Sequence, residues 1–121
     1  MRNTYKSTYK DGLRAEAVAV LVLRLKGYRI LARRYKTPVG EIDIVARRGG
    51  TLVFVEVKHR GSVAAALECL TPSMKGRIVN AARHFIAAYP AYNDYAMRFD
   101  LMAVAGIFSF RHLDNAWPGA A

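Results

Sequence analysis

The sequence predicts an α/β fold in which helices pack against a mixed β-sheet. Two stretches have helical periodicity, and five stretches rich in β-branched and aromatic residues are separated by turn signals. Their order is helix, three strands, helix, two strands, and this interleaving favours a small α/β sandwich over a bundle or a barrel. With 121 residues and 53% hydrophobic content, the chain is expected to form one domain with a buried core.

The N-terminal part predicts an arm and then a helix. Residues 1–10 are polar and basic and are expected to form a flexible arm before a single domain over residues 11–121. Asp11 is expected to cap a helix over residues 12–26, which Gly27 ends. The expected apolar face of this helix consists of Leu13, Ala17, Val18, Leu21, Val22 and Leu25.

The rest of the chain supplies the strands and the second helix. A strand over residues 28–35 precedes the turn signal TPVG, and a hairpin over residues 40–60 follows it. The second helix begins at Thr71 and Pro72 and ends at Pro90. Residues 97–106 and 107–113 are expected to form the last two strands.

The second helix has an apolar face and a basic one. Met74, Ile78, Ala82, Phe85 and Tyr89 recur at helical spacing, as expected for a face that packs on the sheet. Lys75 and Arg83 lie on the opposite face, with Arg77 at its edge. These basic residues are either a solvated face or contacts to phosphate groups.

The charge of the chain indicates a polyanionic partner. There are 19 Lys and Arg against 9 Asp and Glu, a formal net charge of +10. Nucleic acid is the commonest such partner, and an anionic membrane surface is its rival. The apolar run over residues 17–23 is too short to span a bilayer, and the lone Cys69 can form no internal disulfide. A cytoplasmic protein without a membrane partner is therefore expected.

The central hairpin places two acids among apolar residues. If Gly49 and Gly50 form its loop, paired positions sum to 99, so that Asp43 faces Glu56 and Glu41 faces Lys58. A three-residue loop or a bulge would shift this register. Directly opposed like charges repel, and an unpaired buried charge is costly.

Three arrangements could stabilise this acid pair: a shared proton, a nearby cation such as Lys58, or a bound divalent metal. Carboxylate oxygens suit Mg²⁺ or Mn²⁺. The scattered His59, His84 and His112 offer no convincing zinc set. Glu16, on the first helix, either pairs with an arginine or points at the same ion.

These residues resemble the PD-(D/E)xK nuclease superfamily, in which an acid on one strand precedes Glu-x-Lys on the next. The stretches GEIDIVA, LVFVEVKHR, MRFDLMAV and HLDNAW are similar to the YraN-like family of small bacterial proteins, sometimes described as endonuclease-like. The arrangement also resembles archaeal Holliday junction resolvases, where a helix glutamate joins the strand residues. The resemblance implies a restriction-endonuclease-like core, with Glu16, Asp43, Glu56 and Lys58 as catalytic residues.

The function that this resemblance implies is metal-dependent hydrolysis of DNA, with branched DNA as a candidate substrate and a homodimer as its matching assembly. Asp43, Glu56, the backbone carbonyl of Val57 and Glu16 would hold Mg²⁺, and Lys58 would orient the attacking water. Lys75, Arg77 and Arg83 would contact flanking phosphates. The alternatives are a nucleic-acid-binding module without turnover, and a basic surface that docks on membranes or proteins.

Overall fold

Five strands form one mixed sheet in the order β1-β2-β3-β4-β5. The computed structural model describes the backbone of residues 4–119 and the side chains of residues 11–119. The strands are β1 (Arg29–Thr37), β2 (Gly40–Arg48), β3 (Thr51–Lys58), β4 (Ala96–Gly106) and β5 (Ser109–Trp117). β3 and β4 run parallel, and the other neighbouring strands are antiparallel. The predicted α/β class with a mixed sheet is therefore confirmed.

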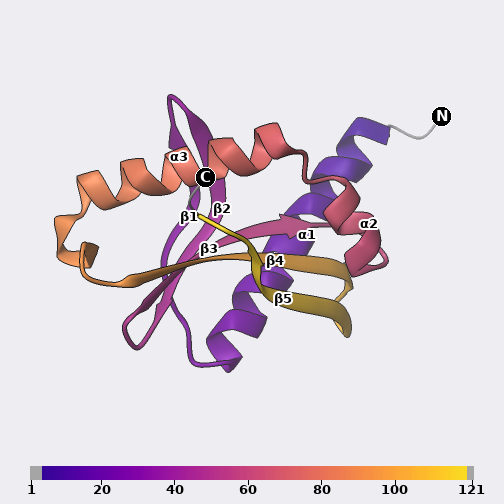
Figure 1. Ribbon diagram of the computed structural model, residues 1–121. Coiled ribbons are helices and arrows are strands. Elements are labelled where there is room, and N and C mark those ends of the chain that lie inside the picture. Colours follow the sequence, from indigo (N-terminus) through magenta and orange to yellow (C-terminus); the bar gives the residue numbers. More distant parts are fainter. Residues whose placement is uncertain (1–3, 120–121) are drawn as a thin grey trace.

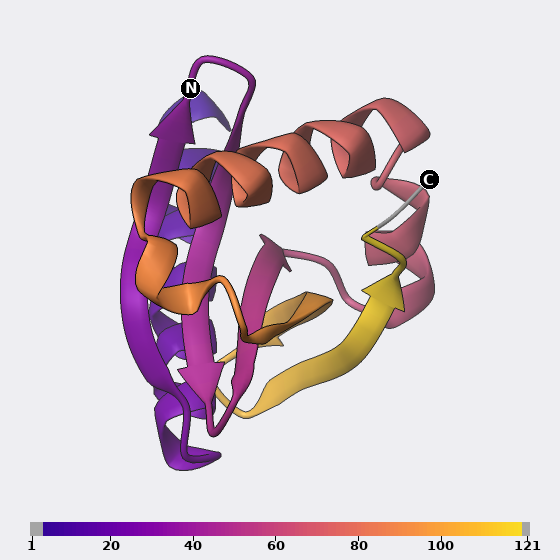
Figure 2. The same cartoon turned by 60° about the vertical axis from the view of Figure 1, so that its left-hand side comes forward.

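Helices cover both faces of this sheet. α1 (Thr4–Leu25) lies on one face and α3 (Pro72–Ala88) lies across the other (Figures 1 and 2). Each helix completes its own hydrophobic core, because strand side chains alternate between the two faces. The connection from β3 to β4 carries α3 and a short helix, α2 (Val63–Glu68), that was not predicted. A 3₁₀ turn over Pro90–Tyr92 follows α3.

α1 begins earlier than the sequence analysis predicted. Its first residue is Thr4, so Asp11 lies inside the helix and does not cap it. Residues 1–3 of the expected arm lie outside the described residues, as do the side chains of residues 4–10. The predicted stop is confirmed, because Gly27 has φ +89°, a conformation that favours glycine after the last helical turn.

The predicted apolar face of α1 is only partly confirmed, because Val22 is buried and Val18 packs against the core, but other members of that face are exposed. The buried side chains include Ala15, Ala19 and Leu23, whereas Leu21 is 48% exposed and Leu25 is 79% exposed. The run AVAVLVL is apolar on every side, so periodicity could not select the packed face. The packed face is the one that also carries Glu16, which finds its ionic partners on β1.

α3 and the central hairpin follow the prediction. The Thr71 hydroxyl accepts a hydrogen bond from the Met74 N–H at 3.2 Å, Pro72 occupies the first turn, and Ile78 and Phe85 are buried. The hairpin pairs run from Arg48 with Thr51 to Ile44 with Val55, so the register that sums to 99 is confirmed for these pairs. In the part of the chain described, no helix is long and apolar enough to cross a membrane.

Candidate active site

The site is formed where regular pairing between β2 and β3 ends. The last regular pair is Ile44 with Val55, although β3 continues to Lys58. Asp43 is the next residue of β2, and its Oδ2 accepts a hydrogen bond from the Val57 N–H at 2.8 Å. An acidic side chain therefore occupies a place where the neighbouring strand would ordinarily offer a backbone carbonyl. This bond fixes the Asp43 carboxylate between the two strands.

Glu56 and Lys58 complete the group from β3. Glu56 is only 9% exposed and shares the α3 face of the strand with Leu52 and Phe54. Its carboxyl group lies near enough to Asp43 for the two acids to interact electrostatically, although regular pairing ends at Ile44 and Val55 and does not include them. The Lys58 Nζ lies 3.2 Å from Glu56 Oε1. Two neighbouring strands thus supply two carboxyl groups and one ammonium group to the same end of the hairpin.

The environment of the pair favours a proton on one acid. Burial raises the pKa of Glu56 to about 8, with a further increase from the neighbouring Asp43 and a partial decrease from Lys58. Burial also raises the pKa of Asp43, against the lowering effects of the Val57 N–H and Lys58. At neutral pH these effects favour a proton on Glu56, and the Lys58 ammonium group lies beside it. A shared proton and a nearby cation were two of the three means of stabilisation that the sequence analysis considered.

Glu16 approaches the group from α1. Its two carboxylate oxygens accept hydrogen bonds from the Nε atoms of Arg33, at 3.0 Å, and Arg34, at 2.9 Å. Arg34 has φ +50°, and this unusual backbone conformation lets two consecutive residues of β1 reach one acid. The prediction that Glu16 pairs with an arginine is confirmed. Its role as an ion ligand stays a prediction.

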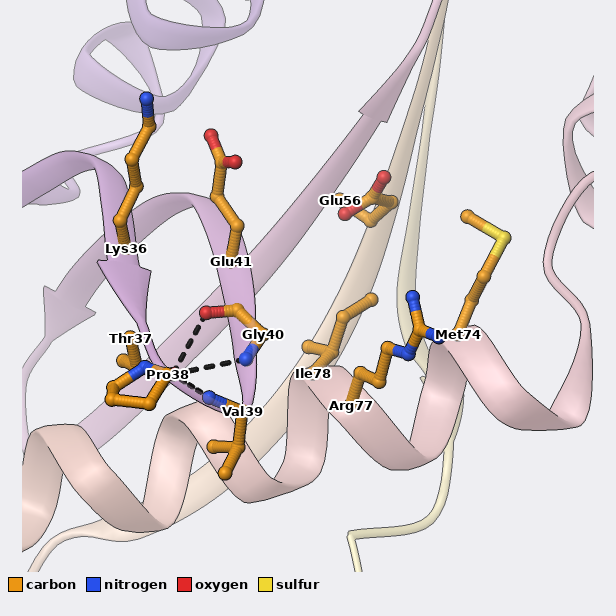
Figure 3. Close-up of a pocket in the computed structure, with 10 residues that line it drawn as sticks. All are labelled: Lys36, Thr37, Pro38, Val39, Gly40, Glu41, Glu56, Met74, Arg77 and Ile78. Carbon is orange, nitrogen blue, oxygen red and sulfur yellow. Dashed lines mark hydrogen bonds between the residues drawn. The ribbon is translucent and has the colours of Figure 1, made fainter.

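Two cavities give access to the acid pair from opposite faces of the sheet. On the α1 face, Glu16, Asp43 and Val57 line a cavity of about 450 Å³. On the α3 face, Glu56 and Arg77 line a second cavity of about 620 Å³. Figure 3 shows Arg77 extending from α3 on the side of the second cavity where Glu56 lies.

Close packing holds α3 beside this second cavity. A Cβ atom on Gly40 would lie 2.6 Å from the Arg77 carbonyl oxygen, so only glycine allows β2 to approach the helix backbone this closely. The turn before Gly40 is closed by the Thr37 hydroxyl, which accepts from the N–H groups of Val39 and Gly40 (Figure 3). The sequence analysis did not predict this support, for which the TPVG turn was the visible signal.

The three predicted phosphate-binding residues separate into two places. Arg77 adjoins the acid pair. Lys75 and Arg83 instead line a different cavity together with Trp117. Lys36, at the end of β1, lines both cavities beside the acids and was not predicted as part of the site. Its position next to the TPVG turn could have suggested it.

A second buried acid was also missed. Asp100, on β4, accepts two hydrogen bonds from Arg98, each of 2.8 Å, one of 2.7 Å from His112 Nε2, and one of 3.0 Å from the Asn115 N–H. Burial acts to raise the pKa of Asp100, but these donors outweigh it and hold the pKa below its usual value. Asp100 was recognisable by the argument used for Asp43, because it is an acid in an apolar strand. The satisfied network gives it a structural role.

The donor set at the hairpin fits a hard divalent cation. Among the described residues, no three His, Cys, Asp or Glu side chains are grouped so that they could hold a metal. The set therefore consists of two carboxyl groups, those of Asp43 and Glu56. Mg²⁺ is commonly held by one or two carboxylates, and water and substrate phosphate complete its coordination. The composition of this pair suits Mg²⁺ or Mn²⁺.

The fold and site define an α/β protein whose mixed sheet and flanking helices are consistent with a restriction-endonuclease-like core. The family model described as "Uncharacterised protein family UPF0102" matches residues 15–104, and the chain belongs to this family. The YraN-like assignment predicted from the motifs is confirmed by this match.

Relatives with the same family name cover nearly the whole chain. The UPF0102 protein of Parvibaculum lavamentivorans is 51% identical over 92% of this chain and 84% of its own length. Those of Bradyrhizobium diazoefficiens and Caulobacter vibrioides are each 46% identical, over 94% and 92% of this chain and 86% and 89% of their own lengths. The similarity therefore includes the whole hairpin that carries the acids.

Proposed function

We propose that this protein is a metal-dependent endonuclease that hydrolyses phosphodiester bonds in DNA. The observation that supports this proposal most is the proximity of the partly buried Asp43 carboxyl group to the buried Glu56 carboxyl group, with the Lys58 ammonium group 3.2 Å from Glu56. Folding alone gains nothing from two adjacent acids in an apolar strand pair, because their mutual repulsion and burial both cost free energy. A reaction that depends on a bound cation would account for the two adjacent acids.

Each residue has a definite part in the proposed reaction. Asp43 and Glu56 would hold Mg²⁺ or Mn²⁺ with the Val57 carbonyl, and the bound ion would supply Lewis-acid activation of phosphate and water. The Val57 N–H keeps the Asp43 carboxylate in place before substrate arrives. Glu56 would bind the ion as a carboxylate, with its proton passing to solvent. Lys58, whose Nζ lies 3.2 Å from Glu56 Oε1, would then be placed to donate a hydrogen bond to the attacking water or the charged phosphate.

The surrounding cations provide contacts for a DNA backbone. Arg77 and Lys36 line the cavity next to Glu56, where they can bind phosphates on either side of the reacting one. Arg33 and Arg34 are partly exposed and are oriented by Glu16 beside the Asp43 cavity, so Glu16 acts in this proposal as a positioning residue, with direct or water-mediated ion contact as its further predicted role. These contacts follow the backbone and read no base sequence.

The net charge of +10 favours nucleic acid as the substrate class. No zinc-finger, helix-turn-helix or RNP pattern is present in the sequence, so recognition by shape is expected. Branched DNA is proposed from the resemblance to junction resolvases, and a homodimer would match its two-fold symmetry.

The test compares cleavage of duplex, flapped and four-way DNA with Mg²⁺, Mn²⁺ or EDTA. Wild type is expected to cleave with either ion and not in EDTA. Asp43→Asn and Lys58→Ala are expected to lose cleavage, whereas Lys75→Ala, a matched lysine variant away from the acid pair, should keep it. Cleavage that survives in both site variants would remove the site assignment.

A binding module without turnover is the second candidate. The observation that favours it is that Lys58 and the shared proton already neutralise the acid pair without an ion. Isothermal titration calorimetry with Mg²⁺ distinguishes the two candidate functions by whether the site binds the ion. Ion uptake by wild type that Asp43→Asn abolishes supports the endonuclease. Tight DNA binding with no ion uptake and no cleavage supports the binding module.

A further inference from the structure

The loop between β4 and β5 exposes an unusual amount of apolar surface. Phe108 is 94% exposed, Ile107 is 58% exposed and Phe110 is 38% exposed. We call these three residues the hairpin tip. A single exposed apolar residue needs no explanation, but three at one turn form a patch, and such patches mark binding sites. Neither core cluster includes Phe108, so folding does not account for it.

The register of the sheet places the hairpin tip close to the acid pair. β3 and β4 are parallel, with Lys58 directly beside Ala103, and β4 continues three residues further to Gly106. At about 3.3 Å per residue, the tip lies roughly 10 Å beyond the level of Lys58. Figure 1 shows the β4–β5 hairpin on the side of the molecule where β3 ends and α2 lies.

Phe108 and Glu56 also lie toward the same face of the sheet. Ala103 belongs to the core on the α3 face, as do the neighbours of Glu56 on β3. Ala103, Ala105 and Phe108 line a cavity of about 350 Å³ with Arg60 and Arg111. A ligand that extends along this face from Lys58 therefore reaches Phe108.

The charges around the hairpin tip decide what ligand suits it. Arg60 and Arg111 flank Phe108, and on the other face Arg14 and His59 line a cavity with Ile107, where Asp11 is the one acid among the lining residues. A second copy of this chain, which carries the same excess of positive charge, would meet repulsion there. A polyanion with flat apolar groups fits both features, because arginines contact its phosphates while an aromatic ring stacks on its bases.

We propose that Phe108 stacks on an unpaired base of the DNA strand whose phosphate lies at the acid pair. This inference rests on the proposed function and specifies its substrate. Glu56 lies level with Leu101, five residues before Gly106, so the hairpin tip lies roughly 16 Å along the strand from the acid pair. With nucleotides spaced at about 3.4 Å along a duplex strand, this separation places the stacked base about five nucleotides from the scissile bond. The preferred substrate is then DNA with unpaired bases that close to the cut, such as a flap, a bubble or an open junction.

Binding in EDTA tests this proposal without any cleavage. Fluorescence anisotropy compares a fully paired duplex with a duplex that has a bubble of three unpaired bases. Wild type is expected to bind the bubble more tightly. Phe108→Ala should lose between about fivefold and about a hundredfold of affinity for the bubble and little for the duplex, and Phe108→Trp should restore it. Leu25→Ala, which truncates another exposed apolar residue, should change neither affinity.

The salt dependence of DNA affinity distinguishes a stacking contribution from a charge contribution. Phe108→Ala should leave the slope of log affinity against log salt unchanged, whereas Arg111→Ala should lower it by about one ion. Equal loss on both DNAs, no loss on either, or no DNA binding by wild type would overturn the proposal. So would a Phe108→Ala variant that only changes oligomeric state in analytical ultracentrifugation, because it would show a second copy at the tip. Selective bubble binding without cleavage in Mg²⁺ would instead refute only the endonuclease.

Discussion

Replacing Glu56 with glutamine should make the protein more stable in alkaline solution. Burial and the neighbouring Asp43 raise the pKa of Glu56 from its ordinary value of 4.5 to about 8. A raised carboxyl pKa contributes stability that is fully present below about pH 4.5 and is lost as pH rises through about 8, because the folded state then holds an ionised acid that it disfavours. Glutamine keeps the shape and does not titrate.

The size of this stability difference follows from the shift in the pKa of Glu56. One pKa unit corresponds to about 1.4 kcal/mol, so the shift to about 8 amounts to a few kcal/mol in the free energy of unfolding. The pKa of Asp43 is raised together with that of Glu56, and this coupling reduces the share that one substitution reveals. We therefore expect the advantage of Glu56→Gln over wild type to grow by at least about 2 kcal/mol between pH 5 and pH 9.

Urea unfolding followed by circular dichroism, in EDTA at pH 5, 7 and 9, measures this difference. Titration of the rest of the chain cancels when the variant is compared with wild type at each pH. Glu41→Gln, an exposed glutamate at the start of the same hairpin, is the matched control and should follow wild type. Stability curves of Glu56→Gln and wild type that stay parallel over this range would refute the argument that Glu56 is buried beside a second acid.

Three further predictions concern the ion, the second buried acid and the glycine beneath α3. Saturating Mg²⁺ should raise the Tm of wild type at pH 8 and leave that of Asp43→Asn unchanged in calorimetric scans, since only a bound ligand stabilises by mass action. Asp100→Asn should lower the free energy of unfolding by about 3 kcal/mol in urea titrations, because Arg98 would lose its charged partner; a change below about 1 kcal/mol would contradict the buried network. Gly40→Ala should cost about 1–3 kcal/mol in thermal unfolding, because its Cβ would lie 2.6 Å from the Arg77 carbonyl oxygen, and an unchanged Tm would show that β2 and α3 do not pack this closely.

The sequence was sufficient to predict the hairpin and its acids because both depend on local rules. Two adjacent glycines limit the loop, and the loop fixes the register from Arg48 and Thr51 to Ile44 and Val55, next to Asp43 and Glu56. α3 was predictable for the same reason, since Thr71 and Pro72 mark its start and its apolar residues recur at one spacing. These features need no knowledge of distant parts of the chain.

Features that depend on tertiary packing were not predictable. α1 has apolar residues all round, and the choice of its buried face depends on where Arg33 and Arg34 lie on β1. The meeting of those two arginines with Glu16 depends in turn on the left-handed backbone of Arg34, a residue type that gives no warning of it. The separation of Lys75 from Arg77 likewise follows from how α3 crosses the sheet.

The bond from Val57 N–H to Asp43 Oδ2 gives one side chain two duties. Asp43→Ala removes a hydrogen-bond acceptor from the β-sheet as well as a carboxylate. An inactive alanine variant could therefore have lost either the proposed ion ligand or the local strand structure. Asparagine retains an oxygen that can accept the same N–H. A substitution of Asp43 that leaves no acceptor would therefore disturb the end of the β2–β3 pairing as well as the proposed ion site, whereas asparagine would remove the charge alone.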